Sequence, residues 1–235
     1  MSKSAIAIIP ARGGSKRIPK KNIKPFEGKP LISYSIQAAA ESGLFDKIIV
    51  STDSEEIAEV AQAYGADIPF IRPKELADDF TGTTPVVNHA INYMREQGHD
   101  YQFACCIYAT APLLTAEYLL AGFNELQKQP EKSFAFSVCT FPFPVQRALR
   151  AHSEDATGVE PMYKEYIGKR SQDLVEAFHD AGQFYWGRSQ DFIDQKGMFA
   201  KHSIPIFMPR SRVQDIDTLE DWQTAELMYR AINFK

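Results

Sequence analysis

The sequence has few cysteines, and their arrangement excludes a disulfide framework. Only three are present, and two of them, Cys105 and Cys106, are adjacent in an apolar run. With Cys139 as the third, the number is odd, and no CxxC spacing typical of a metal site occurs. We interpret all three as small buried hydrophobic residues of a protein that works in the reducing cytoplasm.

Long apolar runs and an excess of positive charge are also missing. No stretch approaches the roughly 20 apolar residues of a membrane span. The apolar run at residues 5–9 is too short for a signal peptide and is followed at once by Pro10 and Arg12. The net charge of -4 gives no global basic field of the kind that non-specific nucleic-acid binders carry. We therefore expect neither a membrane nor a nucleic acid as partner, and any anion site must be local.

Strand-like and helix-like segments alternate from the N-terminus to Val138. The expected buried strands cover residues 4–10, 46–53, 103–112 and 134–138, and the expected helices cover 30–43, 54–65, 86–98 and 115–129. Strands that are continuous apolar runs are typical of a parallel sheet covered on both faces. The pattern predicts one α/β domain with an open, doubly wound sheet, whose ligand lies beyond the carboxyl ends of the strands.

Beyond Val138 this alternation stops. Residues 139–182 lack a long regular period and carry prolines, aromatic residues and many charges. A structureless loop of that length is improbable in a compact domain, so we expect an excursion that packs on something such as a partner subunit. Returning strands are expected at 183–187 and 203–208, and a short strand followed by a helix that Thr218 caps is expected at the C-terminus.

The segment IIPARGGSKRIPKKNI, residues 8–23, changes from a strand into a basic, glycine-containing loop. Gly13 and Gly14 can present backbone N–H groups to an anion, while Arg12 offers a planar fork and Lys16 a point charge to phosphate oxygens. The spacing is neither a Walker P-loop nor a dinucleotide-binding motif. A solvated surface loop is the alternative, but the position directly after the first strand favours a phosphate site.

Two carboxylates near the C-terminus form a second candidate feature. Asp215 and Asp217 are two residues apart, so in an extended segment their side chains share one face. Such a pair can hold Mg²⁺, which takes one or two carboxylates and completes its shell with water and phosphate. The alternative is that these acids favour the positive end of the next helix, which is how we interpret Glu220 and Asp221. A basic phosphate loop with a dicarboxylate indicates nucleotidyl transfer with Mg²⁺ as cofactor.

These motifs resemble those of cytidylyltransferases that activate acidic nine-carbon sugars, the sialic-acid-type CMP-sugar synthetases. The similarity runs through residues 8–23, RPKELADD, ATAPL and DIDTLED, and covers nearly the whole chain. In detail the sequence most resembles the branch that acts on pseudaminic acid. The resemblance implies a Rossmann-like nucleotidyltransferase fold, CTP and an acidic nine-carbon sugar as substrates, and Mg²⁺ as cofactor. It also implies a homodimer formed through an inserted arm at about residues 139–182.

The resemblance further implies individual residue roles. The implied catalytic residues are Arg12, Lys16, Asp215 and Asp217, with the two aspartates as the metal ligands. The implied nucleotide-binding residues are Ala11, Arg12, Gly13, Gly14, Ser15, Lys16, Lys21, Asn22, Arg72, Phe80 and Gly82. The candidate sugar contacts are Tyr108, Thr110, Arg147, His179, Gln183 and Tyr185.

The sugar side departs from the sialic acid pattern. Tyr108 stands where sialate enzymes have a glutamine, and HDAGQFY at residues 179–185 replaces RPNGAIY. We therefore expect a stereoisomer with two acylamino groups, and the same chemistry on sialic or legionaminic acid is the first alternative. A non-catalytic CTP sensor is an alternative of another class, against which the aspartate pair argues. The general base stays open between His179, which is favoured as a substrate contact, and a metal-bound hydroxide.

Overall fold

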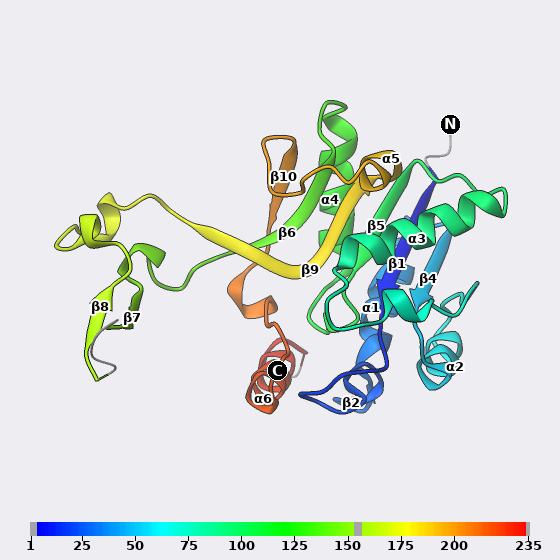
Figure 1. Ribbon diagram of the computed structural model, residues 1–235, viewed down its shortest axis with the longest axis horizontal. Helices are drawn as coiled ribbons and strands as arrows, with labels where there is room; N and C mark the ends of the chain where they lie inside the picture. Colours follow the sequence, from blue (N-terminus) through cyan, green and yellow to red (C-terminus); the bar gives the residue numbers. More distant parts are fainter. Residues whose placement is uncertain (1–3, 153–156, 234–235) are drawn as a thin grey trace.

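The body of the protein is a six-stranded sheet with the strand order β10-β6-β9-β5-β1-β4 (Figure 1). The computed structural model describes residues 4–152 and 157–233, so residues 153–156 of the expected excursion lie outside the described part. The strands of the sheet are β1 Ala5–Pro10, β4 Lys47–Ser51, β5 Phe103–Ile107, β6 Phe134–Thr140, β9 Phe178–Arg188 and β10 Ser203–Phe207. β1 pairs in parallel with β4 and β5, and β10 pairs in parallel with β6. Only β9 runs antiparallel, between β5 and β6. The predicted open and mostly parallel sheet is confirmed.

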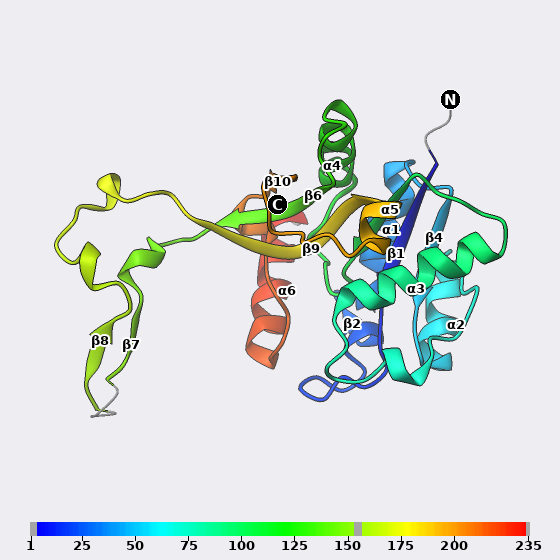
Figure 2. The same ribbon diagram turned by 45° about the horizontal axis from the view of Figure 1, so that its top comes forward.

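Helices cover both faces of this sheet, as Figures 1 and 2 show. They are α1 Leu31–Ser42, α2 Glu55–Ala63, α3 Thr83–Glu96, α4 Ala116–Lys128 and α5 Ser189–Ile193, whereas α6 Leu219–Asn233 packs beside the basic loop instead. Ala7 and Ile9 of β1 pack with α1 and α4, while Ile6 and Ile8 pack with α3 and α5. Alternate side chains of a strand point to opposite faces, so a strand buried on both faces must be apolar throughout. The doubly wound arrangement follows from this composition.

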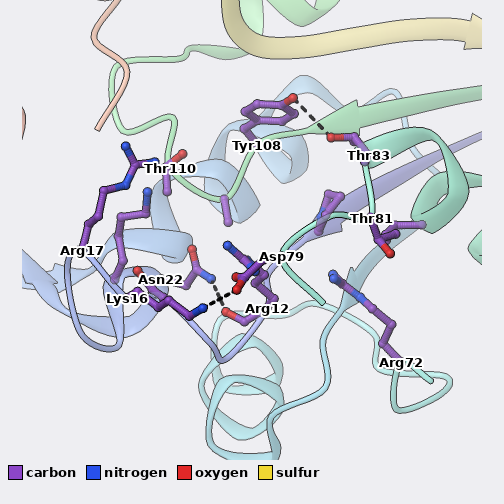
Figure 3. A pocket seen from close by; sticks show the side chains of 16 residues that line it. Arg12, Lys16, Arg17, Asn22, Arg72, Asp79, Thr81, Thr83, Tyr108 and Thr110 are labelled. Atoms are coloured by element: carbon purple, nitrogen blue, oxygen red, sulfur yellow. Dashed lines mark hydrogen bonds and ion pairs between the residues drawn. The ribbon is translucent and has the colours of Figure 1, made fainter. Parts of the chain in front are cut away.

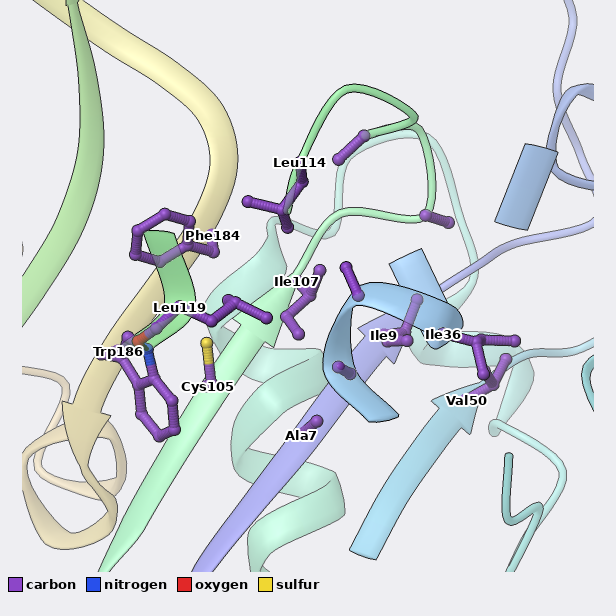
Figure 4. Packing of buried hydrophobic residues seen from close by; sticks show 14 of the residues in the cluster. Ala7, Ile9, Ile36, Val50, Cys105, Ile107, Leu114, Leu119, Phe184 and Trp186 are labelled. Carbon is purple, nitrogen blue, oxygen red and sulfur yellow. Dashed lines mark hydrogen bonds between the residues drawn. The ribbon is translucent and has the colours of Figure 1, made fainter. Parts of the chain in front are cut away.

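β9 enters the middle of the sheet because its side chains suit both faces. Phe184 and Trp186 belong to the cluster on the α1 and α4 side, where Figure 4 shows them beside Leu119, and Tyr185 belongs to the opposite cluster. The indole N–H of Trp186 donates to the carbonyl of Leu119 at 3.0 Å, and its ring stacks on that of Phe45 at 5.0 Å. The strand is longer than the expected 183–187 because its first half pairs with the end of β6.

Local capping signals in the sequence agree with the observed helix ends. Gly43 ends α1 in a left-handed conformation with φ of 63°, which glycine adopts without strain. The hydroxyl of Ser54 accepts from the N–H of Ile57 and begins α2. Thr218 precedes α6, and its hydroxyl accepts from the N–H of Asp221 while the Asp221 carboxylate accepts from the N–H of Thr218. These three predictions are confirmed.

Several expected boundaries are wrong. α3 begins at Thr83 rather than at residue 86, because Pro85 fits a first helical turn, where no N–H donor is needed. β5 ends at Ile107, so residues 108–115 form a loop instead of continuing the strand to Pro112. Residues 213–217 form no strand. The carbonyl of Ile216 and the N–H of Asp217 bind the side chains of Lys21 and Asp221 instead of a neighbouring strand.

Between β6 and β9 the chain leaves the body as a long arm, which Figures 1 and 2 show projecting away from the sheet. Its outer end carries the antiparallel pair of β7 Leu149–Ala151 and β8 Val159–Pro161. Short 3-10 helices at Val145–Arg147, Lys164–Tyr166 and Ser171–Asp173 form the turns. A smaller hairpin of β2 Pro25–Phe26 and β3 Lys29–Pro30 follows the basic loop. Within the described ranges, no helix combines the length and the apolar character that a membrane crossing requires.

Candidate active site

A cavity of about 480 Å³ opens beyond the carboxyl ends of β1 and β5, the position where parallel sheets bind ligands (Figure 3). Its walls come from the basic loop after β1, from residues 79–86 at the start of α3, and from the loop after β5. The residues with implied nucleotide roles that line it are Arg12, Ser15, Lys16, Lys21, Asn22, Arg72 and Gly82. Two candidate sugar contacts, Tyr108 and Thr110, line it as well. The structure thus brings nine of the candidate residues to one cavity, while their roles stay predictions.

The basic loop is held in place by a small hydrophobic cluster of its own. Ile18 and Phe26 are fully buried, and they pack with Trp222 of α6. The rings of Phe26 and Trp222 meet edge to face with centroids 5.5 Å apart. Ile216, which is also fully buried, belongs to the same cluster. One apolar cluster therefore fixes the basic loop and the segment that carries the aspartate pair, although 198 positions separate Ile18 from Ile216 in the sequence.

Asp215 and Asp217 do not line this cavity, but Asp217 contacts two cations that do. Lys21 donates from Nζ to the carbonyl of Ile216 at 2.6 Å and lies 3.5 Å from Oδ1 of Asp217. Arg17 places Nη2 at 2.7 Å from the same oxygen of Asp217. The pKa of Asp215 is raised, first by partial removal from water and next by the charge of Asp217. The two carboxylates are thus close enough to repel each other.

This donor set fits a hard divalent cation. Two neighbouring carboxylates that repel each other are stabilised by a cation, and Mg²⁺ binds to proteins through one or two carboxylates. Within the described residues, no group of three or more histidine, cysteine, aspartate or glutamate side chains could hold a metal ion. The remaining ligands of a cation on Asp215 and Asp217 would have to be water and substrate oxygens.

Asp79 is a site residue that sequence reasoning missed. Its Oδ1 lies 2.5 Å from Nη1 of Arg12, and its other oxygen contacts Nζ of Lys16 (Figure 3). The hydrogen bonds from Lys16 and then from Arg12 hold the pKa of Asp79 below its ordinary value. The carboxylate therefore sits on the two cations assigned to phosphate, and an incoming anion must displace it. The only sequence signal was its place in the RPKELADD motif.

Three further nucleotide candidates, Arg72, Asn22 and Gly13, have hydrogen-bond partners within the protein. Arg72 is buried and donates from Nε to the hydroxyl of Ser51 at 3.1 Å, and burial lowers its pKa. The amide of Asn22 donates to the carbonyl of Arg12 at 3.0 Å and stabilises the loop. The N–H of Gly13, which we expected to face an anion, donates to Oδ1 of Asp53 at 2.8 Å. The protein itself therefore already supplies a partner for that N–H.

Besides Gly13, three other nucleotide candidates lie outside the lining of the cavity. Ala11 is buried beneath the loop, Phe80 is 95% exposed, and Gly14 lies next to Gly13 in the loop. Arg17, Thr81 and Thr83 line the cavity although no role was assigned to them. The two threonines lie in a segment without clear periodicity, so the sequence carried no signal for them.

A second cavity of about 240 Å³ adjoins the first and shares Tyr108 and Thr83 with it. The rings of Tyr108 and Tyr185 lie against each other with centroids 5.3 Å apart. Tyr185 donates from its hydroxyl to Oδ2 of Asp180 at 2.7 Å, and the hydroxyls of Tyr108 and Thr83 lie 3.3 Å apart. Its apolar lining is Val87, Cys106, Phe192, Met198 and Phe199. This cavity therefore combines an apolar wall with hydroxyl and carboxylate groups.

The remaining sugar candidates line neither of these two cavities. Gln183 is only 2% exposed, and its amide donates to the carbonyl of Ala181. His179, at the start of β9, packs on the ring of Phe141 with centroids 4.9 Å apart. Arg147 lies in the arm and donates to the carbonyl of Lys169 at 3.3 Å. Any contact of these three side chains with a substrate stays a prediction.

Comparisons with known proteins bear on the family and the fold of this chain. The family model described as cytidylyltransferase matches residues 6–218. The chain is 45% identical, over 96% of both chains, to a pseudaminic acid cytidylyltransferase of Campylobacter jejuni. It is 30% identical, over 94% of both chains, to a CMP-N,N'-diacetyllegionaminic acid synthase of Legionella pneumophila. In fold it is similar to a CMP:2-keto-3-deoxy-manno-octonic acid synthetase complexed with CTP, with a TM-score of 0.70, 15% identity and coverage of 97% and 99% of the two chains.

Proposed function

The chain belongs to the cytidylyltransferase family, and from that premise we propose that it transfers CMP from CTP to the anomeric hydroxyl of pseudaminic acid, releasing pyrophosphate. The observation that carries this proposal is one cavity at the strand ends where the basic loop and the loop after β5 meet, with Asp217 paired to Arg17 of its lining. The near full-length similarity to the Campylobacter jejuni enzyme supports the choice of sugar.

The basic loop would hold the triphosphate of CTP. Arg12 and Lys16 now contact the carboxylate of Asp79, and phosphate oxygens would take its place. In the reaction the sugar hydroxyl attacks the α-phosphorus, and the bond to the pyrophosphate breaks. Arg12 and Lys16 would then stabilise the charge that develops on the leaving pyrophosphate. Loss of one such preorganised contact typically lowers the rate by about 100-fold or more.

We further propose that Asp215 and Asp217 hold Mg²⁺. The support is the donor set itself, in which two carboxylates repel each other beside the cations of the cavity. A bound Mg²⁺ would neutralise charge on the reacting phosphate. Lys21, which donates to the carbonyl between the two aspartates, would keep their segment against the basic loop. The general base stays open, since His179 lines neither of the two cavities described above.

The second cavity would take the substituents of the sugar. The methyl groups of acylamino substituents suit the apolar wall with Val87 and Phe199, and their amide groups suit Tyr108 and the Tyr185–Asp180 pair. A sugar with two acylamino groups presents both methyl and amide groups, so it can use both parts of this lining. The same chemistry on sialic or legionaminic acid is the alternative, because the relatives include an enzyme that is named for legionaminic acid.

We also propose that two copies of the chain form a dimer through the arm. Phe143, Leu149, Ile167 and Val175 of the arm are all more than 60% exposed, and exposed apolar groups of this kind mark interaction surfaces. A second copy would cover them. Light scattering coupled to size exclusion would then give twice the mass of 26.5 kDa, and a monomer at micromolar concentration would refute the proposal. A cytoplasmic location is proposed as well, on the support of three free cysteines.

The decisive experiment measures pyrophosphate release from CTP and Mg²⁺ with pseudaminic, legionaminic and sialic acids in separate reactions. We expect turnover with pseudaminic acid. Turnover with another of the three sugars alone would keep the reaction and overturn the choice of substrate. Binding of CTP without pyrophosphate release for any sugar would favour the non-catalytic CTP sensor instead.

A further inference from the structure

The acid group of the proposed sugar needs a positively charged partner in the site. A sugar acid of this class carries its carboxylate on the anomeric carbon, next to the hydroxyl that attacks. That carboxylate must therefore approach the phosphates of CTP and the carboxylates of Asp215 and Asp217. Such a crowd of like charges is unfavourable unless a cation lies between them. This inference rests on the proposed function and asks which residue supplies that cation.

Five positively charged side chains line the cavity, and four of them already have other tasks. They are Arg12, Lys16, Arg17, Lys21 and Arg72. Arg12 and Lys16 face Asp79 at the phosphate side. Lys21 is bound to the carbonyl of Ile216, and Arg72 is buried against Ser51. Arg17 differs from these four, because the partner of its guanidinium is the carboxylate of Asp217, one of the two proposed metal ligands.

The position of Arg17 suits a carboxylate at the sugar end of the cavity. Although it follows Lys16 directly, Figure 3 shows its side chain extending away from that of Lys16, toward the side of the cavity where Thr110 lies. Its guanidinium contacts a carboxylate already, with Nη2 at 2.7 Å from Oδ1 of Asp217. The Arg17 side chain is 66% exposed, so it can turn without disturbing the core. When Asp217 serves as a metal ligand, that oxygen is no longer available to Arg17.

We propose that Arg17 binds the carboxylate of the acidic sugar and is a specificity-determining residue of this enzyme. Asp217 holds the guanidinium near the proposed metal site. In the loaded enzyme the planar fork of Arg17 turns to the sugar carboxylate, for which its paired N–H donors are suited. Arg147 and His179, the charged or chargeable sugar candidates from the sequence, lie outside the two cavities of this chain and do not provide such a group there.

The test compares the variants Arg17→Gln and Lys20→Gln. Lys20 is a matched control, because it lies in the same loop, its side chain is also 66% exposed, and it pairs with Glu56 outside the cavity. Calorimetry would measure the Kd of CTP, and separately the Kd of the sugar acid for enzyme loaded with Mg²⁺ and a non-hydrolysable CTP analogue. The same titration would use the carboxamide of the sugar, which lacks the negative charge.

We expect Arg17→Gln to weaken binding of the sugar acid by about 10- to 100-fold, the range for a hydrogen bond to a charged group. Binding of the carboxamide and of CTP should change by less than about threefold, and Lys20→Gln should match the wild type. KM for the sugar should rise accordingly, with a smaller effect on KM for CTP. If Arg17→Gln does not fold, Arg17→Lys keeps the charge, removes the fork and allows the same comparison.

Several results would overturn the inference. One is an equal loss for sugar acid and carboxamide, which would mean that Arg17 does not recognise the charge. Another is a larger loss for CTP than for the sugar, which would place Arg17 on the phosphates. A third is weaker binding of the sugar acid, but not of the carboxamide, in Arg147→Gln instead of Arg17→Gln. That result would assign recognition of the sugar carboxylate to the arm. A wild type that converts none of the three acidic sugars refutes the proposed function itself, which distinguishes the two failures.

Discussion

Replacing Ile216 by alanine tests whether one hydrophobic cluster positions both halves of the site. Ile216 is fully buried between the two aspartates and packs in the cluster with Ile18 and Trp222. The substitution removes a buried branched side chain and leaves a cavity beneath the aspartate pair. We expect a loss of stability together with a loss of catalytic activity that stability alone does not explain.

The size of the stability loss follows from the burial. Truncation of a fully buried isoleucine to alanine costs about 2–5 kcal/mol, whereas Ile216→Val should cost about 0.5–1.5 kcal/mol. For a chain of 235 residues, about 1 kcal/mol shifts the melting temperature by roughly 2–4 °C. Ile216→Ala should therefore lower Tm by about 4–20 °C, and the valine variant by much less. The functional loss arises because the aspartates would no longer be held against the basic loop.

The assay separates these two effects with a control elsewhere in the core. Ile206 of β10 is also buried but packs in the main cluster on the α4 side of the sheet. Urea denaturation measures the stability of Ile216→Ala and Ile206→Ala, and pyrophosphate release at a temperature where both are folded measures kcat and the Mg²⁺ requirement. We expect only Ile216→Ala to need more Mg²⁺ and to lose kcat. Equal activity of two equally destabilised variants would refute the reasoning.

One ion-pair network and two cases of burial give three further predictions. Asp79→Asn removes the carboxylate that would compete with phosphate for Arg12 and Lys16. The Kd of CTP, measured by calorimetric titration, should therefore fall a few-fold. A higher Kd would mean that the Asp79 carboxylate helps to bind CTP. Burial raises the pKa of the three cysteine thiols. A thiol reagent such as DTNB should therefore label none of them rapidly in the native protein at pH 8, and all three in urea. Fast labelling of the native protein would contradict the packing. Burial lowers the pKa of His89 below its ordinary value of about 6.5, so the unfolded chain binds the extra proton first and folding stability should be lost as pH falls below about 6.5. Urea denaturation at pH 5 and pH 7 should show a smaller loss for His89→Gln than for the wild type. An identical loss in the two proteins would assign it to other groups.

The sequence predicted a strand or a helix end correctly where the residues of that segment alone carry the signal. Ala7 and Ile9 alternate with Ile6 and Ile8, and both sets are apolar, which requires a strand buried on two faces. Gly43 and Ser54 mark helix ends through their own backbone and side-chain chemistry. The sequence also located the basic loop after the first strand, because the order of elements places that loop at the carboxyl edge of the sheet.

Tertiary contacts decided what local patterns could not. The end of β5 at Ile107 depends on which strand lies beside it, and residues 213–217 stay irregular because side chains distant in sequence take their backbone groups. In the same way, Asp79 reaches Arg12 across 67 positions, and its place in the RPKELADD motif does not indicate that partner.

The sequence by itself therefore determined the class of fold, the place of the basic loop and the spacing of the aspartate pair, because each of these depends on residues that are neighbours along the chain. Only the tertiary structure decided which cations remain available in the cavity, that Tyr108 lies against Tyr185, and that Ile216 fastens the aspartates to the basic loop. The physical reason is that these contacts join segments far apart in the sequence. Their partners are selected by the packing of the whole sheet and its helices, which no short segment encodes.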